Sequence, residues 1–203
     1  MIGQLIITGI LSYLLGSISS GIIIAKTYKS VNLREMGSRN TGASNVMRLV
    51  GVKPGVVTFI GDFIKAILAC FIGKFIAGEN GIYIAGLCCI IGHNWPVYYK
   101  FKGGKGVACS TAVILFTFPY PAALTAILAC LIVIIVTRMI SLGSITMVIV
   151  FMAMVMFQTN LSPVTSIWAI IIAGLCIVRH ISNIKRVIAG TENKLGSKAE
   201  KSG

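Results

Sequence analysis

Apolar runs follow one another along almost the whole chain, and no other feature restricts its possible folds as much. The runs lie at about 4–25, 56–77, 82–99, 107–118, 122–137, 142–157 and 164–178. Only 11% of the 203 residues are charged, against roughly 25% in soluble domains. An apolar helix of about 20 residues crosses a bilayer. The sequence therefore predicts an all-α integral membrane protein, with one membrane domain over 1–195 and a loose cytoplasmic tail at 196–203.

The segment from 107 to 137 decides the number of spans. As one helix it would be about 46 Å long, too long for a hydrocarbon core of roughly 30 Å. A break at Pro119 and Pro121 places 16 of the 18 lysine and arginine residues on one side, all but Lys65 and Lys74. Cytoplasmic loops are enriched in lysine and arginine. We therefore predict seven transmembrane helices, with the N-terminus outside and the C-terminus cytoplasmic.

The net charge of +13 would suggest nucleic acid as a partner in a soluble protein. Here the positive-inside rule accounts for most of it, so no nucleic-acid partner is predicted. The six cysteines lie in apolar runs without metal-ligand or disulfide spacing. Asp62 is the only aspartate and four glutamates complete the acidic residues, so we predict no metal and no cofactor.

The stretch from His93 to Ser110, HNWPVYYKFKGGKGVACS, joins the end of one apolar run to the start of the next. Glycines allow a ligand to approach the backbone N–H groups closely, and a helix beginning at Val107 would add its positive dipole end. We predict a phosphate site whose binding residues here are His93, Lys102, Gly103, Gly104, Lys105 and Gly106. The alternative is a basic juxtamembrane loop in contact with lipid headgroups.

A second polar cluster, GSRNTGASN, covers residues 37–45 in the loop at 26–54 and is followed by Arg48. Hydroxyl and amide groups beside two arginines suit phosphate binding, because arginine offers a bidentate fork. The alternative is a surface loop of turn-forming residues. We also expect Asn40 or Thr41 to cap a short helix that carries Val46.

A third cluster, RHISN, follows the last apolar run. His180 and Asn183 lie one helical turn apart and share a face. Histidine can transfer protons near neutral pH, although a histidine at a span end can equally be a hydrogen-bonded interfacial residue. Asp62 and Lys65, at i, i+3 inside a predicted span, are either a structural ion pair or part of the site.

The sequence lacks the motifs of several other enzyme classes. Gly104-Lys105 is followed by Gly106, so there is no Walker A motif. There is no Gly-x-Ser-x-Gly elbow. A His-x4-Asp motif would need aspartate at 98 or 185, where Tyr98 and Lys185 stand.

Four motifs, GSRNTGASNVMR, GDFIKA, GHNWPVYYKFKGGKGVA and RHISNIKRVIAGTENK, occur in the order and spacing of a known family. Over nearly its whole length the chain resembles the acyl-phosphate-dependent glycerol-3-phosphate acyltransferases of bacteria. The resemblance implies a seven-span enzyme of the cytoplasmic membrane with its active site on the cytoplasmic face. It would transfer a fatty acyl group from acyl phosphate to the 1-hydroxyl of glycerol 3-phosphate, giving lysophosphatidic acid and inorganic phosphate, the first acylation step of phospholipid synthesis.

The resemblance also implies that neither acyl-CoA nor acyl carrier protein is used directly. Expected partners are glycerol 3-phosphate, acyl phosphate, membrane lipid and the soluble phosphate acyltransferase that makes acyl phosphate. Residue by residue, it implies catalytic roles for Lys105, His180 and Asn183. The phosphate-binding and motif residues carried over are Ser38, Asn45, Arg48, His93, Lys105 and Asn183.

The chain departs from the family at Arg39, where glycine is usual, and at Ser44 and Cys109, where threonine is common. The base for the glycerol hydroxyl is either His180 or a substrate phosphate oxygen. Two other functions fit the same spans and cations: a transporter or channel for an anionic metabolite, and a non-catalytic lipid-binding scaffold. A transporter would place charged or broken helices near the bilayer midplane, whereas these motifs are predicted at one face.

Overall fold

The computed structural model describes residues 1–158 and 161–196, and within these ranges the secondary structure is helical, without strands. The prediction of an all-α protein is confirmed. The chain divides into two compact units, the first built from Met1–Phe116 and the second from Thr117–Leu195. The single domain predicted over 1–195 stays a prediction, and residues 197–203 of the predicted tail lie outside the described residues.

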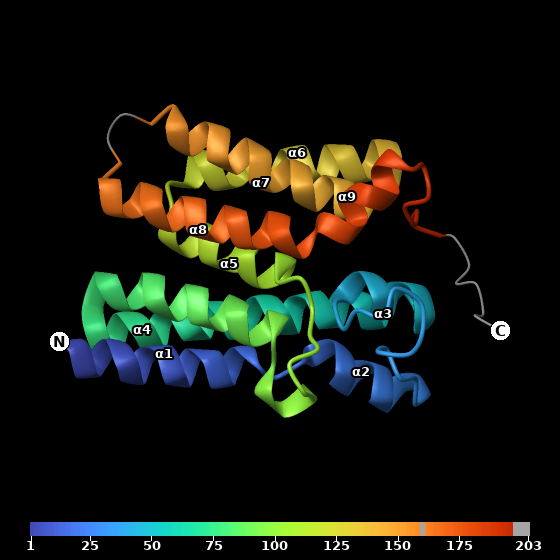
Figure 1. Cartoon of the computed structure of the whole chain (residues 1–203), viewed down its shortest axis with the longest axis horizontal. Helices are drawn as coiled ribbons and strands as arrows, with labels where there is room; N and C mark the ends of the chain where they lie inside the picture. The colour runs from blue at the N-terminus through green and yellow to red at the C-terminus, as the bar shows by residue number, and fades with distance from the viewer. Residues whose placement is uncertain (159–160, 197–203) are drawn as a thin grey trace. The chain divides into compact units, whose positions relative to one another are not determined.

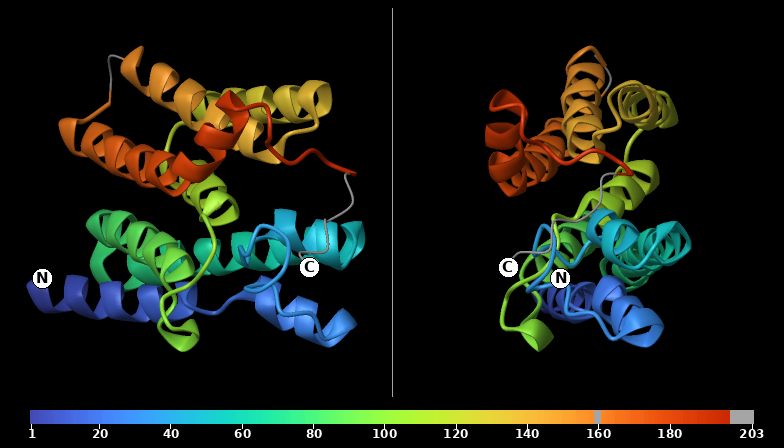
Figure 2. Two further views of the ribbon diagram at one scale, coloured as in Figure 1. Left: turned by 45° about the vertical axis from the view of Figure 1, so that its right-hand side comes forward. Right: turned by 90° about the vertical axis from the view of Figure 1, so that its right-hand side faces the viewer.

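The helices of the first unit are α1 (Ile2–Gly16), α2 (Ser20–Lys29), α3 (Ala43–Leu49), α4 (Val52–Asn94), the short 3-10 helix η1 (Val97–Tyr99) and α5 (Val107–Thr117), whose last residue reaches the second unit. Helix α4 lies against α1, α2 and α3, and the two views of Figure 2 show α1 running beside it. Helix α4 is therefore the element around which the first unit is packed.

Helix α4 doubles back on itself (Figure 1). Ala77 and Gly78 leave the helical conformation, and Gly78 has a φ of 65°, which glycine adopts without steric cost. The two halves then approach closely, because a Cβ on Gly73 would overlap the carbonyl oxygen of Gly81, and a Cβ on Gly81 that of Gly73. The predicted break between the runs at 56–77 and 82–99 is confirmed.

The first apolar run was expected to be one span over 4–25, but the structure interrupts it at Ser17–Ser19. The Ser17 hydroxyl donates to the Tyr13 carbonyl at 2.8 Å, and the Ser19 side chain accepts from the N–H of Ile22 at 3.4 Å, capping α2. The Ile18 carbonyl at the break accepts from Lys65 Nζ at 2.6 Å. A partner 47 residues away thus stabilises this interruption.

The short helix expected after the polar cluster is present as α3, but its predicted cap is wrong. The N-cap residue is Gly42, with no side-chain cap bond. The Asn40 side chain instead accepts from the Gly42 N–H at 3.1 Å, closing a turn before the helix begins. Val46 is fully buried and packs with Ala25 and Leu33, which fixes α3 in the unit.

The second unit contains α6 (Tyr120–Thr137), α7 (Ile140–Met156), α8 (Pro163–Arg179) and α9 (Ile181–Ile188). The predicted break at the prolines is confirmed: Pro119 is the N-cap of α6 and Pro121 stands in its first turn, where a missing N–H costs nothing. Helix α7 packs against both α6 and α8. Phe118 and Phe151 meet edge to face at 4.9 Å inside this unit.

Three helical segments of the described chain are long and apolar enough to cross a membrane: Ile2–Lys29, Val52–Tyr99 and Tyr120–Thr137. The bent pair α8 and α9, with 57° between the two helices, makes a fourth if it is counted as one span. Helices α5 and α7 are apolar but shorter. The predicted count of seven spans and the orientation of the termini therefore stay predictions.

Candidate active site

The glycine loop, Gly103–Gly106, packs directly on the C-terminal end of α4. The Gly104 N–H donates to the His93 carbonyl at 3.0 Å. A Cβ on Gly103 would overlap that carbonyl, a Cβ on Gly104 would overlap His93 Nε2, and Gly106 has a φ of 78°. The three glycines are thus required by close approach and by backbone conformation.

Helix α5 begins at Val107, as the phosphate-site prediction required. Lys105 is half-buried two residues before the first N–H groups of this helix, whereas Lys102 is exposed and its own N–H donates to the Tyr99 carbonyl at 3.2 Å. The loop therefore carries one partly enclosed cation to the positive end of a helix, an arrangement that suits a phosphate group.

A buried charge triad of Asp62, Lys65 and His93 lies in the first unit beneath this loop. Lys65 Nζ is 2.8 Å from Asp62 Oδ1 and 3.1 Å from His93 Nδ1, and Asp62 Oδ1 is 3.5 Å from His93 Nδ1. All three side chains are buried. Asp62 and Lys65 therefore form the ion pair that was one of the two alternatives for them, and a role in the site stays a prediction. The contact of this pair with His93 was not predicted from the sequence. Lys65 and His93 are 28 residues apart, and nothing in the sequence indicates that they are close in space.

The amide of Asn45 organises the polar cluster of residues 37–45. Asn45 is buried, and its Nδ2 donates to the carbonyls of Leu33, Met36 and Asn40 at 3.2, 3.2 and 2.9 Å. Its Oδ1 accepts from the Ser38 N–H at 3.0 Å. Asn45 therefore shapes the loop that presents the exposed Ser38, and a direct contact between Asn45 and phosphate stays a prediction.

Arg39, at the position where the resemblance implies glycine, has a φ of 55°. This left-handed conformation costs a residue with a Cβ about 1–2 kcal/mol. The loop thus keeps the backbone that glycine favours, with the Arg39 side chain exposed. Arg48, half-buried and one turn after Asn45 on α3, is the second arginine of the cluster.

In the second unit, His180 and Asn183 are both buried where α8 bends into α9. His180 Nδ1 lies 2.8 Å from the Cys176 carbonyl oxygen, which can only accept, so the proton is assigned to Nδ1. In the neutral ring Nε2 is then the basic nitrogen. The predicted placement of both residues on one helical turn is consistent with the Asn183 N–H donating to the His180 carbonyl at 2.9 Å.

Glu192 fixes the Asn183 side chain and was missed as a site residue. Asn183 Nδ2 donates to Glu192 Oε1 at 2.9 Å, and Arg186 Nε forms an ion pair with Glu192 Oε2 at 2.9 Å. Glu192 is buried, and these two donors satisfy both of its carboxylate oxygens. One indication of this role is present in the sequence: Glu192 is the only acidic residue in the motif RHISNIKRVIAGTENK.

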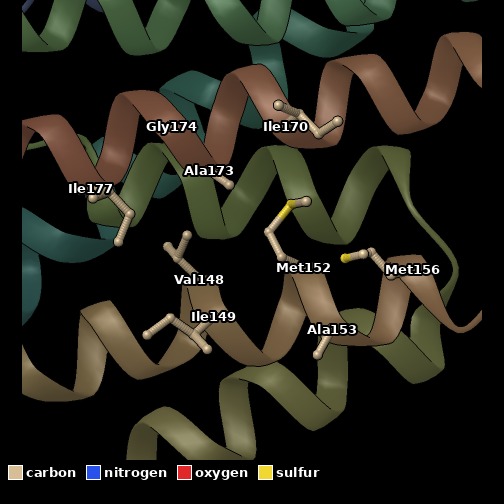
Figure 3. A pocket seen from close by; sticks show the side chains of 9 residues that line it. All are labelled: Val148, Ile149, Met152, Ala153, Met156, Ile170, Ala173, Gly174 and Ile177. Atoms are coloured by element: carbon tan, nitrogen blue, oxygen red, sulfur yellow. The ribbon is translucent and has the colours of Figure 1, made fainter.

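An open apolar groove of about 470 Å³ lies between α7 and α8 (Figure 3). Side chains of both helices face it, among them Met152 and Ile177. Ile177 lies one turn before His180 on the chain. A groove of this kind accepts a hydrocarbon chain from a substrate or from a neighbouring lipid, so it does not by itself identify a ligand.

The predicted site residues therefore fall into two groups. The first unit holds Ser38, Asn45, Arg48, His93, Lys102 and Gly103–Gly106 with Lys105, and the second holds His180 and Asn183. Contacts join His93 to the glycine loop and Ser38 to Asn45. Action of the two groups on one substrate stays a prediction.

Long apolar helices whose apolar side chains stay exposed are the features of a helical membrane protein, and the basic glycine loop gives it a candidate anion site. A family model described as glycerol-3-phosphate acyltransferase matches residues 6–190. The chain belongs to this family.

Similar proteins cover almost the whole chain. A glycerol-3-phosphate acyltransferase of Thermoanaerobacter pseudethanolicus is 41% identical over 195 residues, covering 96% of this chain and 98% of its own. One from Halalkalibacterium halodurans is 42% identical over 205 residues, with 98% of each chain covered.

Crystal structures of PlsY (YgiH), an integral membrane glycerol 3-phosphate acyltransferase, are similar in fold. Its glycerol 3-phosphate form has a TM-score of 0.86 and 38% identity, covering 95% of this chain and 96% of that one. Its lysophosphatidic acid form has a TM-score of 0.83 and 37% identity, with 95% of each chain covered. The likeness supports an integral membrane acyltransferase.

Proposed function

We propose that this protein transfers a fatty acyl group from acyl phosphate to the 1-hydroxyl of glycerol 3-phosphate, giving lysophosphatidic acid and inorganic phosphate. The likeness to PlsY, whose crystal structures include a glycerol 3-phosphate form and a lysophosphatidic acid form, carries the proposal. The glycine loop with its half-buried Lys105 supports it from the chemistry of this chain.

Both proposed substrates carry phosphate, and an acyl phosphate is already an activated donor. The protein then needs to orient two anions and stabilise charge on the leaving phosphate. Ser38, Arg48 and Lys105 offer a hydroxyl and two cations for this, with Lys102 and His93 beside the loop. Asn183, fixed by Glu192, offers an amide. No covalent nucleophile is required.

The base for the glycerol hydroxyl is His180 or an oxygen of a substrate phosphate, and we favour the phosphate. Asp62 and Glu192, the acidic residues buried near these clusters, are already engaged, since Asp62 pairs with Lys65 and Glu192 pairs with Arg186. His180, with its proton assigned to Nδ1, is the alternative.

We further propose seven spans in the bacterial cytoplasmic membrane, with residues 26–54, 100–106 and the tail on the cytoplasmic face and Gly78–Gly81 outside. The position of 16 of the 18 lysine and arginine residues supports this orientation. Membrane lipid and the soluble enzyme that makes acyl phosphate are the proposed partners.

Cysteine labelling tests this orientation. In a cysteine-free variant with Cys109→Ser, which keeps a donor to the Asp62 carbonyl, a cysteine at the exposed Glu79 should react with an impermeant maleimide on intact cells. A cysteine at Asn193 should react only after the cells are opened. Labelling of Asn193→Cys from outside would contradict the seven-span topology.

Assay of the purified protein tests the activity. Without added metal, it should form lysophosphatidic acid from palmitoyl phosphate and glycerol 3-phosphate, with stoichiometric release of phosphate. Inorganic phosphate should inhibit, because it occupies the same site as the leaving group, and palmitoyl-CoA should support little or no turnover. Equal turnover with palmitoyl-CoA would overturn the proposed donor. Anion flux across liposomes without acyl transfer would identify a transporter instead.

A further inference from the structure

We propose that the charge triad of Asp62, Lys65 and His93 holds the glycine loop in place and, with it, Lys105. Asp62 and Lys65 are then positioning residues for the acyl transfer, an inference that rests on the function proposed above. They do not touch substrate themselves, and their effect reaches the reaction through His93 and the loop.

The Lys65 ammonium is immobilised by three partners. Its Nζ lies 2.6 Å from the Ile18 carbonyl oxygen, 2.8 Å from Asp62 Oδ1 and 3.1 Å from His93 Nδ1. An ammonium group has three donors, of which the Ile18 and Asp62 oxygens accept two, and His93 Nδ1 is the third neighbour. Lys65 thereby joins the break between α1 and α2 to both halves of α4. With side-chain exposures of 7% for Lys65 and 2% for Asp62, neither charge is placed to bind a ligand from solvent.

His93 transmits this arrangement to the loop through two contacts. Its Nδ1 edge faces Asp62 and Lys65, while Nε2, on the far side of the ring, lies where a Cβ on Gly104 would be. Its carbonyl accepts from the Gly104 N–H at 3.0 Å. The ring and the backbone of His93 therefore both set the position of Gly104. Because Lys105 is the next residue, they also set the position of Lys105.

A second connection leads from the triad to the helix that follows the loop. Cys109 Sγ donates to the Asp62 carbonyl oxygen at 3.3 Å. Cys109 is the third residue of α5 and is fully buried. The Asp62 backbone and the His93 ring thus hold both sides of Lys105, which gives the otherwise costly burial of two ions a functional reason.

The first test is Lys65→Met, which keeps the length of the side chain and removes its charge. The value of kcat/KM for palmitoyl phosphate should fall roughly 10- to 100-fold, as expected when a reacting group is displaced by about 1 Å. Lys74→Met is the matched control: Lys74 lies on the same helix and pairs with Glu79 at 3.8 Å, but both are exposed. Its turnover should stay within about twofold of wild type.

The second test separates positioning from stability. Lys65→Met should lower the thermal midpoint, because it leaves the buried Asp62 carboxylate with only His93, at 3.5 Å, as a partner. The double variant Asp62→Leu/Lys65→Met removes both ions and should recover stability. Positioning predicts that activity does not recover with it, because His93 has lost both partners. If activity returned together with the thermal midpoint, the triad would be purely structural and the inference wrong.

The third test is coupling to the loop. Added to Lys105→Ala, Lys65→Met should cost at most about twofold more, because its effect runs through Lys105. If the two losses multiplied, Lys65 would act elsewhere and the inference would fall. If wild-type protein makes lysophosphatidic acid and Lys65→Met is equally active, this inference is wrong but the proposed function stands. A wild-type protein inactive with palmitoyl phosphate would overturn the proposed function and the inference with it.

Discussion

Replacement of Gly104 by alanine is expected to lower kcat/KM for palmitoyl phosphate about 100-fold or more. The added methyl group would occupy the position of His93 Nε2. His93 cannot turn aside easily, since Asp62 and Lys65 hold its other ring nitrogen and its carbonyl is bonded to Gly104 itself. The loop must then move away from the ring and carry Lys105 with it, and a displacement of about 1 Å costs roughly this much.

The matched control for this substitution is Gly3→Ala. A Cβ on Gly3, within α1, meets no atom within 4 Å, so this variant should retain wild-type turnover and gain a little helix stability. Both variants are compared by initial rate in detergent and by thermal midpoint. Gly104→Ala activity within threefold of wild type would show that the loop can shift without loss, contrary to the geometry described above.

The second large effect is expected for Lys105→Ala, which should lose roughly ten- to 150-fold in rate while the protein still inserts and folds. A charge-assisted hydrogen bond to phosphate is worth about 1.5–3 kcal/mol, and this range gives the loss when its donor is removed. Lys105 is half-buried at the start of α5, so solvent screens its charge less than that of an exposed lysine.

Lys100→Ala is the comparison for Lys105→Ala. Lys100 is exposed and lies before the glycines, and its loss should cost less than about threefold in the same phosphate-release assay. Equal and small losses from the two substitutions would favour the alternative in which the basic stretch only contacts lipid headgroups.

The sequence predicted most helices because their signals are local. The prolines at 119 and 121 and the glycine at 78 mark breaks that backbone chemistry imposes wherever the rest of the chain lies. The interruption at Ser17–Ser19 could not be predicted in this way. It depends on the contact between Lys65 and the Ile18 carbonyl and on the close approach of Gly16 to the Cys89 backbone.

In the candidate site, too, local features could be predicted from the sequence and contacts between distant residues could not. The glycine loop, Lys105 and the start of α5 were predictable, since glycine spacing and a following apolar run are read from consecutive residues. The partners that orient the site were not: His93 reaches Asp62, and Tyr13 donates to the Trp95 carbonyl at 2.8 Å across 82 residues. Such pairs are set by the packing of helices, which hydrophobic periodicity does not specify.

The spacing of Asp62 and Lys65 also bears on how the protein enters the bilayer during synthesis. An aspartate or a lysine at the centre of a nascent helix costs about 2.5–3.5 kcal/mol on insertion. These two lie one turn apart on the same half of α4, so their ion pair can form as soon as that turn is helical. This half of α4 can thus insert into the bilayer with the two charges already paired. His93 lies on the second half of α4, so it can join the pair only after that half has been synthesised.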